Sequence, residues 1–235
     1  MGLFSSYVAD RPIRPLAISC FEDKLIQSAV NKILSKIYEP IFLTCSYGFR
    51  PGVGCHDALK ALMKSANANH DGAIIEIDIR KYFNTIPHSE IIGILSKKIS
   101  DHKFLKLIEV LITAPTMEDG IISKNTCGCP QGSILSPILA NIYLHYVIDE
   151  WVESIKPLCA GQVWLCRYCD DAVICCQFAK DAIRVKEALG KRLAKYNLKL
   201  NEEKTKLVDF RKIAGKRASF DFLGFTHYLG KSKNG

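Results

Sequence analysis

The sequence lacks the features that mark several common classes of protein. It contains no run of about 18 apolar residues and no signal peptide, so we expect neither a membrane-spanning helix nor a secreted protein. It also contains no internal repeat and no low-complexity tract, so a repeat architecture is not expected either. These absences predict a globular protein of the cytoplasm that does not act at a membrane.

The sequence also lacks a disulfide framework, although it has ten cysteines. Cys175 and Cys176 are adjacent in a strand-like run, and most of the others lie in apolar segments. Cys166 and Cys169 form one CxxC pair with no second pair, and positions i and i+3 of a strand point to opposite faces. We therefore interpret the cysteines as reduced thiols and do not expect a structural zinc site.

Length and charge set broad limits on the fold and its partners. The chain has 235 residues, 48% of them hydrophobic, which suffices for one substantial core or two small ones. The net charge of +8 is compatible with a polyanionic partner, but a charge of this size does not identify one.

The pattern of apolar residues predicts a mixture of helices and hairpins. Helices are expected at 21–38, within 46–63 after a Gly/Pro loop, twice within 88–113 with a break near Ser100-Asp101, from an N-cap at Ser136 through Ile148, and at 182–196. Strands are expected at 73–79, in hairpins at 117–125 and 163–176, and around 198–200 and 220–225. This is an α+β pattern, so the sheet should be largely antiparallel.

Two adjacent acids interrupt the second hairpin, in the stretch "RYCDDAVICC". Like charges resist burial, so Asp170 and Asp171 either face water in a turn or hold a metal ion. Asp78 ends another β-rich run, with Glu76 on the same face by alternation. Isolated acids at strand ends are ordinary, but two such sites also suit a pair of Mg²⁺ ions in phosphoryl transfer.

Seven blocks of the sequence, in order, carry a resemblance to reverse transcriptases encoded by group II introns. "YCDD" (168–171) fits the Tyr-x-Asp-Asp hairpin. The other blocks are "RPIRPLAISCFEDKLIQSAV", "SYGFRPG", "IDIRKYFNTIPH", "GCPQGSILSPILANIYL", "LKLNEEKTK" and "FLGF". The resemblance covers residues 8–228. It implies a reverse transcriptase fingers–palm fold whose antiparallel palm sheet is backed by helices, with fingers at 1–72 and about 90–128, palm at 73–89 and 129–228, and a basic tail at 229–235.

The resemblance also implies roles for individual residues. Asp78 and Asp170 match the principal metal ligands, Asp171 the supporting acid, and the backbone carbonyl of Ile79 a further ligand. Phe83 resembles the steric gate that crowds a ribose 2′-hydroxyl. The remaining implied contacts are with the nucleotide (Arg14 at the triphosphate, Gln131 and Gly132 at the nascent base pair, Lys204 at the pyrophosphate) and with nucleic acid on the finger side (Arg11, Lys24 and Arg50).

Four of these residues are also compatible with a purely structural role. Phe83 follows Tyr82 in an apolar segment and is compatible with core packing. Gln131 and Gly132 fit a polar turn before a helix, and Lys204 fits a solvated run of charges.

The sequence departs from the family pattern in several places. Asn84 stands where the intron family usually has Asp, Ser133 makes "PQGS" of the commoner "PQGG", and no thumb follows the closing palm segment. We therefore expect an RNA-directed DNA polymerase of group II intron type, in a truncated or partner-dependent form. Its cofactors would be two Mg²⁺ ions, for which Mn²⁺ can substitute.

The expected partners are an RNA template, a primer, deoxynucleoside triphosphates, and either intron RNA or a thumb-bearing protein. Two alternatives stay open on the sequence: a non-catalytic RNA-binding, maturase-like module, and an RNA-dependent RNA polymerase.

Overall fold

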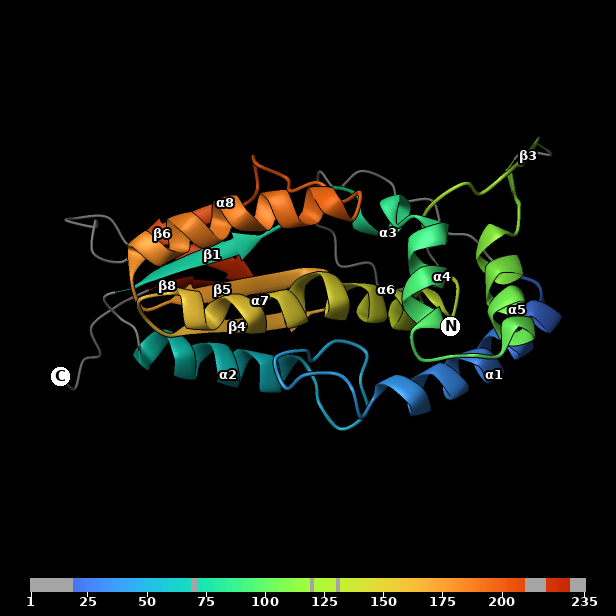
Figure 1. Ribbon diagram of the computed structural model, residues 1–235, viewed down its shortest axis with the longest axis horizontal. Coiled ribbons are helices and arrows are strands. Elements are labelled where there is room, and N and C mark those ends of the chain that lie inside the picture. Colours follow the sequence, from blue (N-terminus) through green and yellow to red (C-terminus); the bar gives the residue numbers. More distant parts are fainter. Residues whose placement is uncertain (1–18, 69–71, 119–120, 130–131, 210–218, 229–235) are drawn as a thin grey trace, which may run out of the picture.

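The computed structural model describes residues 19–68, 72–118, 121–129, 132–209 and 219–228. Its centre is a four-stranded sheet with the order β4-β5-β1-β6 (Figure 1). The strands are β1 (Ala73–Ile77), β4 (Val163–Tyr168), β5 (Asp171–Cys176) and β6 (Lys206–Asp209). Every neighbouring pair in this sheet is antiparallel, which confirms the predicted sheet type.

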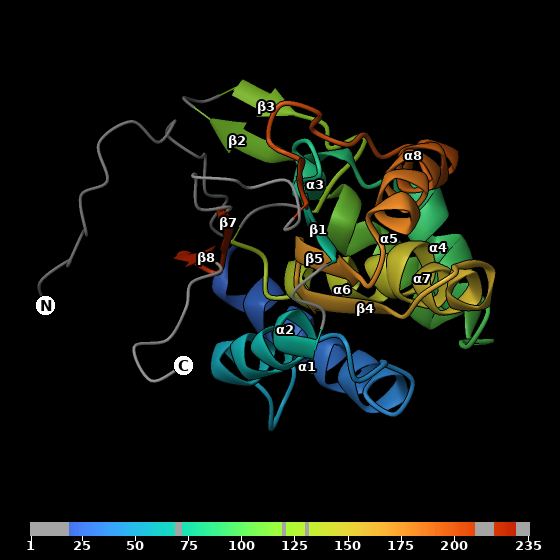
Figure 2. The ribbon, with the colours of Figure 1, turned by 90° about the vertical axis from the view of Figure 1, so that its left-hand side faces the viewer.

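The strands are apolar on both faces because both faces are covered. Ile75 and Ile174 belong to the larger core, on the side of α8 (Ala179–Lys195), whereas Ile74 and Val173 belong to a second core. Helix α2 (Cys55–Ala68) and the β7–β8 hairpin (Ser219–Phe222 and Phe225–Tyr228) cover this second face. Figures 1 and 2 show α8 and α2 on opposite sides of the sheet. The chain thus builds one large and one small core.

A long helical segment lies beneath the sheet on the side of the larger core. It runs from α6 (Ser136–Leu144) through a π-helical turn, η1 (His145–Asp149), into α7 (Glu150–Ile155) and a short 3₁₀ turn, η2 (Lys156–Leu158). The segment therefore continues past the predicted end at Ile148. Its N-cap is Leu135 instead of the predicted Ser136, because Ser136 is already helical and Pro137 occupies the first turn.

The other helices gather beyond one end of the sheet (Figure 1). They are α1 (Phe21–Tyr38), α3 (Tyr82–Thr85), α4 (His88–Ser96) and α5 (His102–Thr113), and the hairpin β2–β3 (Thr116–Glu118 and Ile121–Ser123) projects from this group. Asp101 caps α5 by accepting hydrogen bonds from the backbone N–H groups of Lys103 and Phe104. This cap confirms the predicted helix break near Ser100-Asp101.

Several local predictions were wrong. Strand β1 has five residues instead of about seven. Residues 198–200 contribute only a bridge at Leu200, and the strand follows at β6, because the intervening loop folds back onto Asp78. The segment 220–225 is not one strand but turns at Leu223 and Gly224, both with positive φ, to form the β7–β8 hairpin.

Helix α1 spans the predicted residues 21–38 but buries only part of its apolar side chains. Its buried side chains are Gln27, Val30, Leu34 and Tyr38, whereas Leu25, Ile26 and Ile33 are exposed. Within the described ranges, no helix is both long and apolar enough to span a membrane. All ten cysteines lie in these ranges and carry free thiols.

Candidate active site

The acids of the β4–β5 hairpin lie at its closed end. Tyr168 pairs with Asp171, so Cys169 and Asp170 form a two-residue turn, in which Cys169 adopts φ 57°. A turn was one of the two settings expected for Asp170 and Asp171. The structure places Asp170 in the turn and Asp171 as the first residue of β5. Asp170 is half-buried and Asp171 is exposed.

Strand β1 brings the third acid to the same place. It pairs with β5 so that Ile77 lies opposite Ala172. Extending this register by one residue sets Asp78 beside Asp171, and directly paired residues of antiparallel strands share a face. The register therefore brings Asp78, Asp170 and Asp171, from strands far apart in the sequence, to the same end of the sheet. We call this end, with its three acids, the acidic edge.

The backbone of Asp78 is held by the loop that precedes β6. Its carbonyl accepts a hydrogen bond from the backbone N–H of Asn201 at 2.8 Å, and its N–H donates to the Thr205 hydroxyl at 3.3 Å. Ile79 pairs with Leu200 in an isolated bridge. Lys204 is exposed in this loop, one residue before Thr205. The loop thus places Lys204 next to the segment that carries Asp78 and Ile79, and the contact of Lys204 with pyrophosphate stays a prediction.

Phe83 lies beside the segment that leads to Gly132. Its carbonyl accepts a hydrogen bond from the N–H of Cys129 at 2.7 Å. A Cβ added to Gly128 would lie 2.7 Å from the same carbonyl oxygen, so only glycine permits this contact. The Phe83 ring is half-buried, packs against the core and meets the Tyr82 ring edge-on at 5.4 Å. Phe83 therefore packs against the core, and its role as a steric gate stays a prediction.

The segment of Ser133 and Ile134 is held by a residue that the sequence pattern did not single out. Gln27 of α1 is buried, and its side-chain carbonyl accepts hydrogen bonds from the Ser133 hydroxyl and the Ile134 N–H, at 3.2 and 3.1 Å. Gln27 lies in line with the buried Val30 and Leu34. A polar residue in phase with a buried stripe is the signal that could have revealed it. Gly132 adopts φ 101°, and Gln131 lies outside the described residues.

The predicted basic contacts differ in how they are placed. Lys24 is exposed on α1, and Arg11 and Arg14 lie outside the described residues. Arg50 is mostly enclosed, pairs with Glu39 at 2.7 Å and donates to the carbonyls of Leu43 and Ser46. Arg50 therefore orders the loop 43–50, and its contact with nucleic acid stays a prediction.

A buried ion pair lies behind the acidic turn. The Arg167 and Asp149 side chains are both fully buried and joined by two hydrogen bonds of 2.6 and 2.5 Å. Burial pushes the pKa of Asp149 upward, but the charge and hydrogen bonds of Arg167 outweigh it and lower this pKa below its usual value. Both side chains are therefore charged at neutral pH.

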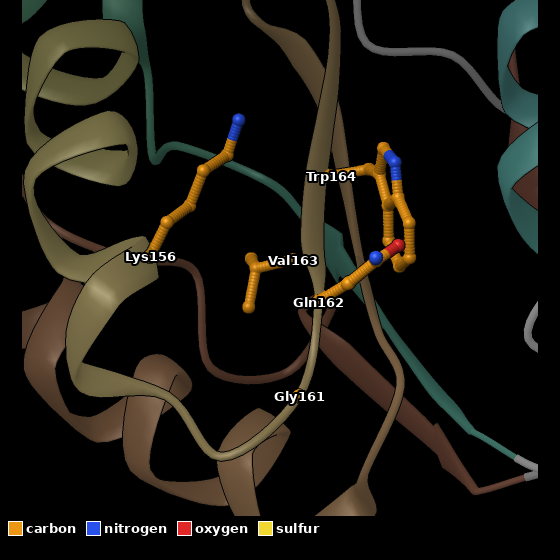
Figure 3. Close-up of a pocket in the computed structure, with 5 residues that line it drawn as sticks. All are labelled: Lys156, Gly161, Gln162, Val163 and Trp164. Atoms are coloured by element: carbon orange, nitrogen blue, oxygen red, sulfur yellow. The ribbon is translucent and has the colours of Figure 1, made fainter.

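A shallow pocket lies at the other end of the hairpin (Figure 3). It is lined by Lys156, Gly161, Gln162, Val163 and Trp164. Val163 pairs with Cys176, at the end of the hairpin opposite to the Tyr168–Asp171 pair, and Lys156 is engaged by Glu153 at 2.5 Å. The pocket is thus separate from the acidic edge.

The donor set of the acidic edge fits a hard divalent cation. Carboxylate and backbone carbonyl oxygens are the ligands that Mg²⁺ prefers, and Mg²⁺ keeps several positions for water and phosphate. In the described part of the chain, no three His, Cys, Asp or Glu side chains form a group that could hold a metal ion, so metal binding by Asp78, Asp170 and Asp171 stays a prediction. Cys166 and Cys169 pack in different cores. Glu76 pairs with Lys206 and does not join the acidic edge.

An antiparallel sheet with acids where two strands meet and helices behind it agrees with the fingers–palm fold of a polymerase. The family model described as reverse transcriptase (RNA-dependent DNA polymerase) matches residues 9–227. The chain belongs to this family.

Curated relatives confirm the predicted resemblance. The group II intron-encoded protein LtrA of Lactococcus lactis subsp. cremoris is 45% identical over 148 residues, which are 62% of this chain and 24% of that protein. An uncharacterized 91 kDa protein in the cob intron of Schizosaccharomyces pombe is 45% identical over 145 residues (61% of this chain and 17% of that protein). Protein YkfC of Escherichia coli is 30% identical over 227 residues, with 83% of this chain and 59% of that protein covered. The chain spans about a quarter or less of the first two relatives.

Solved structures agree on the fold. Telomerase from Candida albicans, solved with a fragment of telomeric RNA, superimposes with a TM-score of 0.68 at 14% identity, over 86% of this chain and 36% of the telomerase chain. Telomerase from Candida tropicalis superimposes with a TM-score of 0.69 at 15% identity, over 87% of this chain and 36% of the telomerase chain. At this identity the likeness concerns the fold alone.

Proposed function

We propose that this chain is an RNA-directed DNA polymerase of group II intron type, which extends a primer 3′-hydroxyl with deoxynucleotides along an RNA template. The observation that carries the proposal is the β1–β5 register together with the two-residue turn, which bring Asp78, Asp170 and Asp171 to the same end of the sheet. Family membership and the similarity to group II intron-encoded proteins support it.

The family is generally dependent on divalent metal ions, and we propose Mg²⁺, with Mn²⁺ as a substitute. Asp78, Asp170 and the Ile79 carbonyl would hold two ions, with Asp171 in support. When bound, such ions activate the primer hydroxyl and neutralise the charge that develops on the phosphates. The protein's own task is to fix the positions of these oxygens.

The other residues of the site position the nucleotide. Phe83 would occlude a ribose 2′-hydroxyl, and the turn of Gln131 and Gly132 would pack against the new base pair. Lys204 would donate a proton to the departing pyrophosphate, supported by its place in the loop that bonds Asp78. Arg14 would contact the triphosphate.

The finger-side cations would contact the template–primer backbone. They are Arg11, Lys24 and Arg50, and phosphate contacts of this kind dominate affinity for nucleic acid.

The division into fingers and palm, and the wider setting, belong to the same proposal. We assign fingers to 1–72 and about 90–128, and palm to 73–89 and 129–228. We further propose a cytoplasmic location, supported by the ten free thiols, and intron RNA or a thumb-bearing protein as partner.

The test is primer extension on an RNA template with Mg²⁺ and deoxynucleotides. Asp78→Asn or Asp170→Asn should lower the rate about a thousandfold, which corresponds to about 4 kcal/mol of transition-state stabilisation. RNA affinity, measured by fluorescence anisotropy, should stay nearly unchanged because phosphate contacts lie elsewhere.

Glu76→Gln is the matched control, because this carboxylate lies on the same strand but pairs with Lys206. It should keep near wild-type activity, because this half-buried carboxylate is engaged by Lys206 and not by the predicted metal ligands. An Asp78 or Asp170 variant that extends primers within tenfold of wild type would show that these acids do not hold the metals. Equal use of ribonucleotides by the wild-type chain would favour an RNA polymerase instead.

A further inference from the structure

Arg167 is the largest fully buried side chain in the described part of the protein, and every N–H of its guanidinium is used. Two hydrogen bonds go to Asp149. The other three go to the side-chain oxygen of Asn141 at 2.9 Å, the Cys169 carbonyl at 3.0 Å and the Ser46 hydroxyl at 2.8 Å. A guanidinium has five such donors, so Arg167 is fully satisfied in this position.

These bonds join three parts of the chain at the acidic turn. The Cys169 carbonyl belongs to the peptide that leads into Asp170. Asn141 of α6 donates in turn to the Gly48 carbonyl at 2.5 Å. The loop 43–50 is also held by backbone hydrogen bonds between Arg167 and both Cys45 and Tyr47, each 2.8 Å long. Arg167 therefore links the turn, the helix α6 and the loop.

The π-helical turn supplies the counter-charge. Asp149 is its last residue, and π turns inside α-helices are uncommon and frequent at functional sites. The extra residue of such a turn changes the direction of the side chains that follow it. In this helix the turn coincides with the carboxylate that grips Arg167 through both oxygens. The irregular turn of the helix thus ends at the residue that forms the ion pair with Arg167.

Stability alone does not account for this arrangement. Burying two charges costs desolvation energy, and replacing a buried ion pair by apolar side chains is often neutral or stabilising. A side chain that bonds the turn directly has another effect, which is to fix its position. A displacement of 1 Å in a catalytic group can lower a rate about a hundredfold.

We propose that Arg167 is a positioning residue that fixes the turn bearing Asp170 and couples it to the loop 43–50. Asp149 and Asn141 hold the guanidinium in place. The proposal rests on the proposed polymerase function for its catalytic consequence. The expected loosening of the turn, in contrast, is independent of any activity.

Two variants test the proposal. Arg167→Lys keeps the charge beside Asp149, but its single ammonium cannot reproduce the fork of bonds to the turn and to Ser46. The double variant Arg167→Met/Asp149→Leu removes both charges together and avoids a buried unpaired carboxylate. Arg192→Met is the control, because Arg192 bonds the carbonyls of Tyr146 and Val147 in the π turn but contacts no residue of the hairpin turn in the described structure.

The first measurement is hydrogen exchange of the backbone amides in 166–173, alongside urea unfolding. In either Arg167 variant these amides should exchange at least about tenfold faster, while helix α8 keeps its protection. The control should leave 166–173 unchanged. Unchanged exchange in a folded Arg167 variant would overturn the proposal, whatever the activity of the protein.

The second measurement separates kcat from KM in primer extension. Both Arg167 variants should lose about 10- to 100-fold in kcat, with a smaller change in the KM for the deoxynucleotide. Faster exchange with an unchanged kcat would refute the positioning role but leave the polymerase assignment intact. Full activity of Asp78→Asn would refute the polymerase assignment, and the exchange result would still decide whether Arg167 orders the turn.

Discussion

Gly48 offers a sharp test of how closely the loop 43–50 packs against the acidic turn. A Cβ added to Gly48 would lie 2.4 Å from the backbone nitrogen of Cys169 and 3.0 Å from the carbonyl carbon of Tyr168. Both are backbone atoms, so neither can rotate out of the way. In Gly48→Ala either the loop or the turn must therefore move.

The expected cost follows from two opposing effects. Replacing glycine by alanine in a compatible conformation stabilises a protein by about 0.4–1 kcal/mol, because the unfolded chain loses freedom. Forcing a methyl group into a closely packed position costs about 1–3 kcal/mol. Since backbone lies on the other side of the contact, the second effect should dominate, and we expect Gly48→Ala to destabilise by about 1–2 kcal/mol.

The assay is urea unfolding followed by circular dichroism, with Gly93→Ala as the matched control. Gly93 is exposed in α4, and no atom lies within 4 Å of its added Cβ. There the substitution should stabilise by about 0.5–1 kcal/mol, as expected inside a helix. The two variants should thus shift the free energy of unfolding in opposite directions. A Gly48→Ala protein at least as stable as wild type would refute the close packing of loop and turn.

Two further predictions concern the nucleotide and the buried thiols. Phe83→Ala should raise the use of ribonucleotides relative to deoxynucleotides in competition assays, and an unchanged ratio in an active variant would mean that Phe83 only packs. Burial raises the pKa of Cys129 to about 12 and that of Cys175 to about 11. The neutral thiol is thus favoured in the folded state, whereas the unfolded chain loses the thiol proton above a pKa of about 8.5. Each of the two thiols should therefore lower the free energy of unfolding by about 1.4 kcal/mol per pH unit above that value. In urea titrations from pH 8 to 10.5, Cys175→Ala should flatten this decline and Cys55→Ala, at an exposed site, should not; equal slopes would contradict the effect.

The sequence was informative where local rules and packing agree. The antiparallel sheet, the hairpin at 163–176 and the break at Asp101 follow from alternation and capping, and the structure has all three. Residues 198–200 were misjudged and Gln27 was overlooked because long-range contacts decide their structure. The loop after Leu200 bonds the Asp78 backbone, and α1 buries Gln27 for a partner more than a hundred residues away.

The acids of the candidate site could be predicted from the sequence, but the residues that hold them in place could not. Adjacent carboxylates in an apolar run are visible in the sequence as an anomaly, whatever their cause. Arg167 shows no such anomaly, because an arginine before a turn is usually solvated and its partners come from distant segments. Its burial depends on the coincidence of a π turn, a loop and a hairpin, which no periodicity in the sequence reports.

The position of β4 has a consequence for the solubility of the protein. β4 is an edge strand of the sheet, and unpaired edges promote association between sheets of different molecules. The loop 43–50 covers the closed-turn end of this edge through its two backbone hydrogen bonds to Arg167. The contact between Arg167 and the loop 43–50 should therefore also hinder edge-to-edge aggregation. A variant that releases the loop would expose unpaired backbone groups of β4 to strands of other molecules.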